Sequence, residues 1–167
     1  VDTDLAADNT NGFDAFSTNS PRGVDNVDLT EDDILGAQAD LEAAIAPMDS
    51  RYLVVSPPSY NSLLKIEAFR NTLYGAAMGN LDGSKGYGYA GHILSFDVYK
   101  SNLLESGTAG KKNAAFQREA IALCVQRGIQ LKHTFNIEDG MFDQYAASIV
   151  YGHRMIKNNH GVEVDGK

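Results

Sequence analysis

The stretch from residue 51 to residue 102 constrains this chain most, because proline and glycine divide it at fixed places. Residues 52–55 form a short continuous apolar run, which predicts a strand buried on both faces of a sheet. Pro57 and Pro58 cannot extend that strand, but proline fits the first turn of a helix. A helix is therefore predicted from residue 57 to about residue 70, and the unit contains no obvious catalytic group.

A glycine-rich stretch and a second strand follow this helix. Residues 75–91 contain six glycines together with Asn80, Asp82 and Ser84, which predicts a long mobile loop. From residue 93 to residue 100 apolar and polar side chains alternate, so these residues are predicted to form a strand.

The first clear element before this unit is a helix, predicted over residues 31–45. Thr30 and Asp33 have the spacing of a capping box. Apolar residues then recur at helical spacing, and these are Ile34, Leu35, Ala37, Leu41, Ala44 and Ile45. Pro47 ends the pattern. Residues 1–28 are polar without a period and are predicted to be an extended loop or arm.

The region after the second strand is less regular. Residues 105–113 are predicted to be a polar loop, and residues 114–126 are apolar without a clean period, so they fit either a helix or a strand. Residues 129–135 alternate between apolar and polar side chains, which predicts a strand.

The last part of the chain mixes both periods. Five apolar residues at helical spacing, Phe142, Tyr145, Ala146, Ile149 and Val150, predict a helix. The tail 151–164 is predicted to be extended, with a turn at residues 158–161. Strands and helices without strict alternation indicate an α+β fold.

The charge of the chain is uneven. The 167 residues suit one domain, and their net charge is −8. Residues 1–50 hold twelve Asp or Glu and one Arg, a net charge of −11, whereas residues 51–167 hold ten acidic and thirteen basic residues, a net charge of +3. Two interpretations stay open: a solvated acidic segment, or a head-to-tail contact between the acidic end of one copy and a more basic face of the next. Nucleic-acid binding through the whole surface is disfavoured.

Several classes of protein are excluded or disfavoured by composition. No run of eighteen apolar residues exists, so no membrane-spanning helix is expected, and the N-terminus lacks the pattern of a signal peptide. The first residue is Val, as in an excised or processed piece. Cys124 is the single cysteine, so no internal disulfide can form, and a buried inert thiol is expected.

Ser62 and Lys65 form the only pattern with a catalytic counterpart. A serine three residues before a lysine on a helix can place the amine beside the hydroxyl and activate it. The competing interpretation is two exposed polar positions on a helix, and no second catalytic element accompanies them. No catalytic residue is therefore predicted.

Metal and cofactor sites are not indicated either. The four histidines lack the spacing of paired metal ligands, and these are His92, His133, His153 and His160. Residues 79–85 lack the order of a phosphate-binding loop, and residues 86–91 precede a strand rather than the helix of a dinucleotide fingerprint. No cofactor and no metal are predicted.

The order of motifs nevertheless resembles a known family. The segment 51–64, Arg-Tyr-Leu-Val-Val-Ser-Pro-Pro-Ser-Tyr-Asn-Ser-Leu-Leu, is similar to the central segment of tailed-bacteriophage major capsid (coat) proteins. The segment 91–102, Gly-His-Ile-Leu-Ser-Phe-Asp-Val-Tyr-Lys-Ser-Asn, resembles the next signature of that family, and residues 120–122, Gln126 and residues 151–152 resemble later ones. The positions that carry the resemblance are Arg51, Pro57, Pro58, Leu63, Leu64, Gly91, Val98, Tyr99, Ser101, Asn102, Tyr151 and Gly152.

The resemblance implies a Hong Kong 97-type coat fold. Residues 30–140 would form the axial domain, with a central mixed sheet that includes residues 52–56 and 93–100. Residues 141–167 would supply a helix and a strand that return to the peripheral domain, and residues 1–29 an extended acidic arm. The family's N-terminal arm, extended loop and spine helix have no counterpart here, so the chain resembles the C-terminal portion of a coat subunit.

The function that the resemblance implies is structural. The chain would belong to a self-assembling subunit of an icosahedral bacteriophage capsid, forming pentamers and hexamers that enclose DNA without sequence-specific binding. Scaffolding and portal proteins would be partners, no membrane would be involved, and the subunit would occur in the virion capsid and, during assembly, in the host bacterial cytoplasm. The glycines of residues 75–91 would let that loop flex between hexamer and pentamer positions.

Three other functions stay open. A bacterial encapsulin-type compartment shell has the same fold but encloses a cargo enzyme. A serine hydrolase would use Ser62 and Lys65, and a soluble binding module would hold a ligand in the loop 75–91.

Overall fold

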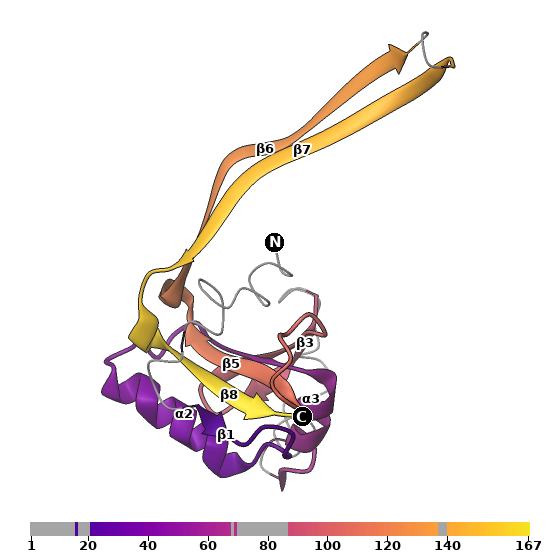
Figure 1. Cartoon of the computed structure of the whole chain (residues 1–167). Helices are drawn as coiled ribbons and strands as arrows, with labels where there is room; N and C mark the ends of the chain where they lie inside the picture. The colour runs from indigo at the N-terminus through magenta and orange to yellow at the C-terminus, as the bar shows by residue number, and fades with distance from the viewer. Residues whose placement is uncertain (1–15, 17–20, 68, 70–86, 137–139) are drawn as a thin grey trace.

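The computed structural model describes residues 16, 21–67, 69, 87–136 and 140–167. Within these residues the backbone forms a globular part, built on a six-stranded sheet, and a long two-stranded hairpin that projects from it (Figure 1). The predicted α+β class is confirmed. Strands predominate, and two α-helices accompany them in the described part of the chain.

The six-stranded sheet has the strand order β1-β8-β5-β2-β4-β3. The strands are β1 (Arg22–Gly23), β2 (Arg51–Val55), β3 (Tyr89–Ile93), β4 (Phe96–Lys100), β5 (Lys111–Gln117) and β8 (Gly161–Gly166). Strand β2 runs parallel to β4 and antiparallel to β5, so the sheet is mixed. Strand β8 lies between β1 and β5, which brings segments far apart in the sequence into one sheet.

Helix α2 (Glu31–Ala43) confirms the predicted capping box. The Asp33 backbone N–H donates to the Thr30 hydroxyl at 3.3 Å, and the Thr30 backbone N–H donates to the Asp33 carboxylate at 2.9 Å. The residues that the helix buries are Ile34, Ala37 and Leu41. The helix ends before the predicted residue 45: Ile45 has a φ of 58° and is 88% exposed, so it does not belong to the apolar face.

The apolar strand and the proline-initiated helix are both confirmed. Residues of β2 alternate between buried and half-buried, so the strand is fully covered on one face and partly covered on the other. Ser56 caps helix α3 (Pro57–Leu63), because its hydroxyl accepts a hydrogen bond from the Ser59 backbone N–H at 3.2 Å. This helix ends at Leu63 and is shorter than predicted.

The prediction of one strand over residues 93–100 is wrong. Strand β3 is followed by a tight turn in which Leu94 has a φ of 51°, and β4 then runs back antiparallel to β3. The apolar–polar alternation continues through this turn, so the pattern did not indicate a reversal. Gly91, predicted to end the glycine-rich loop, lies inside β3. Residues 75–86 of that loop lie outside the described residues.

The region predicted only as helix or strand forms strands. Strand β5 occupies its first residues, a single 3-10 turn, η3 (Arg118–Ala120), follows, and strand β6 (Ile121–Asn136) completes it. The predicted strand 129–135 is confirmed as part of β6. The polar loop predicted to reach residue 113 ends earlier, where β5 begins.

The predicted helix over residues 142–150 is wrong. These residues lie in strand β7 (Phe142–Met155), which pairs antiparallel with β6 to form the projecting hairpin. Several of the apolar residues are aromatic or β-branched, and such side chains favour strands. Strand β6 supplies the hydrogen bonds of β7 across the hairpin, which a helical period within one segment cannot reveal.

The predicted extended tail with its turn is confirmed. Strand β7 leads to a 3-10 turn, η4 (Asn158–His160), and then to β8. At the base of the hairpin the backbone N–H groups of Ile156 and Lys157 both donate to the Ala120 carbonyl, at 2.8 and 3.2 Å. The hairpin is therefore fastened to the globular part where η3 and η4 meet.

The core fills both faces of the six-stranded sheet. Both helices contribute to the larger cluster, whose members include Ile34, Leu41, Leu53, Val55, Leu63, Phe96, Val98, Val162 and Val164. A smaller cluster on the other face contains Phe16, Leu104, Ala114 and Ala120. In the described residues, neither helix has the length and hydropathy needed to cross a membrane.

Leu41 and Ile45 occupy the same predicted apolar stripe but have opposite environments, since Leu41 is 0% exposed and Ile45 is 88% exposed. We expect Leu41→Ala to lower the free energy of unfolding by about 2–5 kcal/mol, because it leaves a cavity in the core. The matched control Ile45→Ala is expected to change it by less than about 0.5 kcal/mol. Urea unfolding followed by circular dichroism measures both, and equal losses would contradict the placement of Ile45.

Candidate functional site

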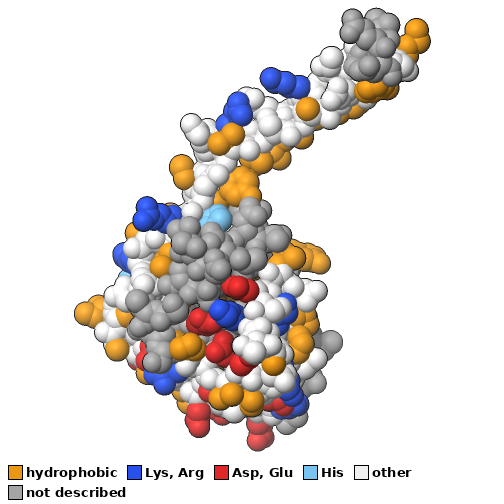
Figure 2. All heavy atoms as spheres, in the orientation of Figure 1, with side chains coloured by type: hydrophobic (Ala, Val, Ile, Leu, Met, Phe, Trp, Pro, Cys, Tyr) orange, Lys and Arg blue, Asp and Glu red, His pale blue; other side chains and the backbone are white. Residues whose placement is uncertain are grey.

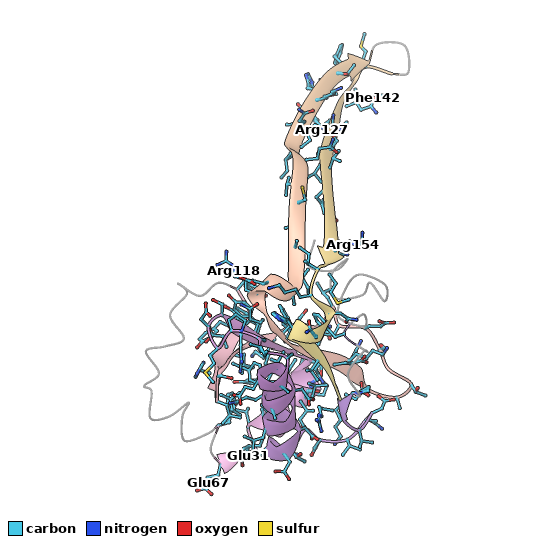
Figure 3. The ribbon with its side chains drawn as sticks, turned by 90° about the vertical axis from the view of Figure 1, so that its left-hand side faces the viewer. Glu31, Glu67, Arg118, Arg127, Phe142 and Arg154 are labelled. Atoms are coloured by element: carbon cyan, nitrogen blue, oxygen red, sulfur yellow. The ribbon has the colours of Figure 1, made fainter. Side chains whose placement is uncertain are left out.

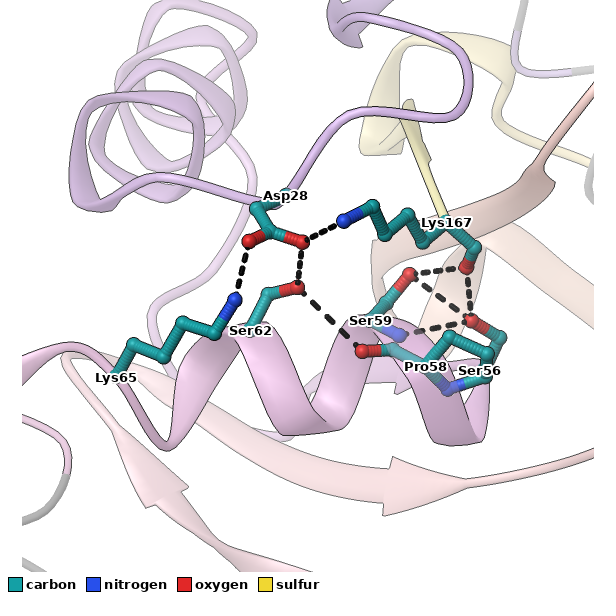
Figure 4. A network of polar contacts seen from close by, with 7 residues as sticks. All are labelled: Asp28, Ser56, Pro58, Ser59, Ser62, Lys65 and Lys167. Carbon is teal, nitrogen blue, oxygen red and sulfur yellow. Dashed lines mark hydrogen bonds and ion pairs between the residues drawn. The ribbon is translucent and has the colours of Figure 1, made fainter.

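A third residue holds Ser62 and Lys65, the pair with a catalytic counterpart. The Ser62 hydroxyl donates a hydrogen bond to one oxygen of Asp28 at 3.0 Å, and the Lys65 ammonium pairs with the other oxygen (Figure 4). A serine nucleophile must give its proton to the neighbouring base. Here the Ser62 proton points to the Asp28 carboxylate, the lysine is engaged by the same carboxylate, and Ser62 is buried. The arrangement is that of a structural ion pair.

Asp28 has a third partner, the ammonium group of Lys167, at 2.6 Å. The hydrogen bonds from Lys167, Lys65 and Ser62, in that order of effect, hold the pKa of the Asp28 carboxyl well below its usual range. The network therefore keeps Asp28 ionised. Nothing in the sequence pattern of residues 62–65 indicated a carboxylate partner so far along the chain.

The first turn of α3 extends this network to strands β5 and β8. The hydroxyls of Ser56 and Ser59 both donate to the backbone carbonyl of Lys167 (Figure 4). The buried amide of Asn113 on β5 accepts from the Ser56 backbone N–H at 2.8 Å and donates to the Ser59 hydroxyl at 3.1 Å and to the Val164 carbonyl at 3.1 Å. These contacts tie α3 to two strands of the sheet, which is a structural task.

Arg51, the first position of the resemblance, is 1% exposed. Its guanidinium donates to the Pro47 carbonyl at 2.9 Å and to the Ala46 carbonyl at 2.8 Å. A third hydrogen bond reaches the Ser95 hydroxyl at 3.4 Å. Arg51 therefore joins the end of α2, the start of β2 and the turn between β3 and β4.

The other positions of the resemblance fall in both parts of the molecule. Leu63, Gly91 and Val98 are buried, Leu64, Tyr99, Ser101 and Tyr151 are half-buried, and Pro57, Pro58, Asn102 and Gly152 are exposed. The ring of Tyr99 makes edge contacts with the rings of Tyr52 and Tyr89, at centroid distances of 5.9 and 5.6 Å. Tyr151 and Gly152 lie on β7, apart from the rest. The importance of these positions for function stays a prediction.

The histidines have no common site. His92 contacts Asp97 at 3.1 Å, His133 contacts Asp143 at 2.8 Å, and His160 is buried, which lowers its pKa. No group of three or more potential metal ligands occurs among the residues that the structure describes.

The hairpin of β6 and β7 carries a surface that the sequence analysis missed. Large apolar side chains are exposed along it, and among them Ile129 is 79%, Leu131 68% and Tyr145 64% exposed (Figure 2). The prediction that Cys124 is buried is wrong. Cys124 lies on β6, in the projecting hairpin, and is exposed. An isolated two-stranded hairpin is marginally stable in water, and exposed apolar patches of this kind mark interaction sites. The alternation of apolar and polar side chains in residues 129–135 was the one indication in the sequence that this strand has an apolar face.

These features are typical of a structural protein with surface available for association. The polar network ties elements together, and the hairpin offers apolar surface for association. The chain belongs to the phage capsid protein family, whose family model matches residues 1–161. This match confirms the resemblance to bacteriophage coat proteins, and membership of the family supports a structural role in a capsid shell.

Solved structures show the same fold. A structure from Mycobacterium phage Che8 superposes with a TM-score of 0.64 at 20% identity, covering 92% of this chain and 57% of that one. The capsid of Ralstonia phage GP4 gives a TM-score of 0.58 at 14% identity, covering 85% of this chain and 49% of that one. A virus-like particle from Pyrococcus furiosus gives 0.55 at 13% identity, covering 91% and 57%. A comparison with curated proteins gave no match.

The chain spans between 49% and 57% of the length of these three structures. At these identities the likeness concerns the fold alone. The assembly and the partners of a whole subunit are therefore a separate question.

Asp28→Asn is expected to destabilise the fold near neutral pH, because it removes the carboxylate that Lys167, Lys65 and Ser62 share. The folded-state pKa of Asp28 is lowered, so its contribution is fully present above the unfolded-state pKa of about 4 and is lost as the pH falls further. The difference in urea midpoint between wild type and variant should therefore shrink below about pH 4. A difference that stayed constant down to pH 2 would contradict this role.

Ser62 is expected not to react with fluorophosphonate probes, because its hydroxyl is buried and donates to Asp28. Mass spectrometry of the treated protein measures the labelling, and Ser62→Ala serves as the blank. Labelling of Ser62 that disappears in Lys65→Ala would restore the hydrolase hypothesis.

Proposed function

We propose that this chain is part of a subunit that assembles into the pentamers and hexamers of an icosahedral bacteriophage capsid and encloses the viral DNA. The observation that carries the proposal is the match of the phage capsid protein family to residues 1–161. The exposed apolar side chains of the hairpin support it, because they require association with further polypeptide.

We further propose that the fold is of the Hong Kong 97 type. The six-stranded sheet with α2 and α3 then corresponds to the axial domain, and the β6–β7 hairpin to the part that reaches the peripheral domain. The boundary predicted at residue 140 falls between β6 and β7, whereas β8 pairs with β5 in the six-stranded sheet. On this proposal the hairpin, residues 121–155, is the natural unit, and β8 belongs with the axial domain.

The proposed partners follow from assembly. Scaffolding and portal proteins would act during assembly in the host bacterial cytoplasm. DNA would be enclosed without sequence-specific contacts. The flexing of the loop 75–91 between pentamer and hexamer positions stays a proposal that concerns residues outside those described.

A compartment shell that encloses a cargo protein is the second candidate. It is favoured by the likeness to the virus-like particle from Pyrococcus furiosus. The two candidates share the fold and differ in what the shell encloses.

Electron microscopy of the subunit, expressed alone and with a scaffolding protein, tests the proposal. We expect closed shells or rings with fivefold and sixfold positions. Nuclease-protected DNA inside shells from infected cells would favour the capsid, and a co-purified protein cargo without DNA would favour the compartment. Absence of shells, rings and sheets under all conditions would contradict both candidates.

A further inference from the structure

The two faces of the β6–β7 hairpin differ in their chemistry. Paired residues of antiparallel strands lie on the same face, and faces alternate along each strand. Arg154 pairs with Ala122, Arg127 with Val150, and Lys132 with Ala146. Positions 154, 150 and 146 of β7 are separated by even numbers of residues, so all three cations lie on one face.

This cationic face, defined by Arg127, Lys132 and Arg154, has no carboxylate among its described residues. The other described side chains on it are Ala122, Cys124, Gln130, Thr134, Phe142, Gln144, Ala146, Ser148 and Val150. The carboxylate of Asp143 lies on the opposite face, where it contacts His133. All three cations are exposed, and none forms an ion pair with another described residue.

The opposite face of the hairpin carries most of its large apolar side chains. Its exposed members include Leu123, Val125, Leu131, Phe135, Tyr145 and Ile149. The two faces therefore differ in chemistry, and an acidic surface complements the charge of the cationic face.

Helix α2 carries the complementary charge on its outer side. Its exposed residues include Glu31, Asp32 and Glu42, and the helix contains no lysine or arginine. We call these three residues the acidic stripe. Neighbouring carboxylates are already engaged, since Asp40 accepts two hydrogen bonds from Arg22 at 2.7 Å. Glu31 and Asp32 have no cation among the described residues, and Glu42 lies 3.8 Å from Arg51.

The spacing of the two charge sets agrees. The acidic stripe spans residues 31–42, which is about 16 Å at the rise of an α-helix. Successive cations on the hairpin lie at levels four residues apart along β7, which is about 13 Å at the rise of a strand. Each end of the acidic stripe can therefore reach one of two neighbouring cations. Leu35 on α2 is 43% exposed and Val150 on the hairpin is 37% exposed, so each surface also offers an apolar contact.

The two surfaces cannot meet within one copy. The hairpin projects from one end of the globular part, and Glu31 at the start of α2 lies at the other end (Figures 1 and 3). A contact between them must therefore join two copies head to tail, which is the type of interface that builds rings. We propose that the cationic face of the β6–β7 hairpin docks on the acidic stripe of α2 of a second copy.

The proposal rests on the proposed function, since a shell supplies the neighbouring copies. It also locates the charge asymmetry of the sequence in two defined surfaces. Contacts between exposed charges are screened by salt, so the association should weaken as the ionic strength rises.

Two charge-reversed variants test the contact. The first carries Arg127→Glu, Lys132→Glu and Arg154→Glu, and the second carries Glu31→Lys and Asp32→Lys. Glu42 is left unchanged in the second variant, because it pairs with the buried Arg51 guanidinium at 3.8 Å. All five substituted positions are exposed, and circular dichroism with thermal unfolding confirms that each variant folds. In the first variant both surfaces are acidic, and in the second both are basic.

Each variant alone should associate at least tenfold more weakly than wild type in sedimentation velocity at 50 mM NaCl. An equimolar mixture should recover association to within about threefold of wild type, because each hairpin then finds a surface of opposite charge. The gain on mixing should disappear at 500 mM NaCl. A variant with Lys100→Glu and Arg118→Glu, exposed charges on the globular part, is the control and should associate like wild type.

Two results would overturn the proposal. One is wild-type association in each variant alone, and the other is a mixture no stronger than its components. Loss of binding to duplex DNA by the first variant, with wild-type self-association, would assign the cationic face to nucleic acid instead. Because mixing measures the contact between two copies, it stays informative if no shells form, in which case the proposed function fails and the docking contact does not.

Discussion

The buried guanidinium of Arg51 is the interaction on which the arrangement of the globular part depends. A cation removed from water is costly unless hydrogen bonds replace its hydration. The carbonyls of Ala46 and Pro47 supply those bonds from the turn between α2 and β2. Ile45 and Ser50 in that turn have φ values of 58° and 55°, which residues other than glycine rarely adopt. The backbone is thus bent around the cation, and this fixes the end of α2 beside the first residue of β2.

The placement of β2 by Arg51 affects the rest of the sheet, because β2 pairs with both β4 and β5. Strand β5 pairs in turn with β8, and Asn113 on β5 binds the capping turn of α3. Arg51 and Asn113 therefore act at the two ends of the same strand pair. One fixes the helix that precedes β2, and the other fixes the helix that follows it.

The elements that could be predicted from the sequence are those whose determinants are local. Thr30 and Asp33 cap α2 within one turn, and Pro57 with Pro58 marks the start of α3. The turn at Leu94 could not be predicted, because a non-glycine residue adopts a positive φ there without any proline or glycine at the turn. Residues 142–150 of β7 are wrongly predicted as a helix, because their hydrogen-bond partner is another strand. The Asp28 network was missed for a similar reason, since its carboxylate lies 34 residues from Ser62.

Some of the charged residues are paired within the fold, and others face solvent. Part of the acidic first third of the chain is neutralised within the fold, where Asp40 pairs with Arg22 and Asp28 pairs with two lysines. Glu31 and Asp32 instead face solvent at the start of α2, where the helix dipole favours them without requiring a cation. The cations of the hairpin lie on the side of the molecule away from Glu31, with Arg154 at the base of the hairpin and Arg127 further along it (Figure 3). Folding therefore leaves two surfaces of opposite charge that one copy cannot bring together, and a protein that works in many copies can use that separation to set the direction in which neighbours add.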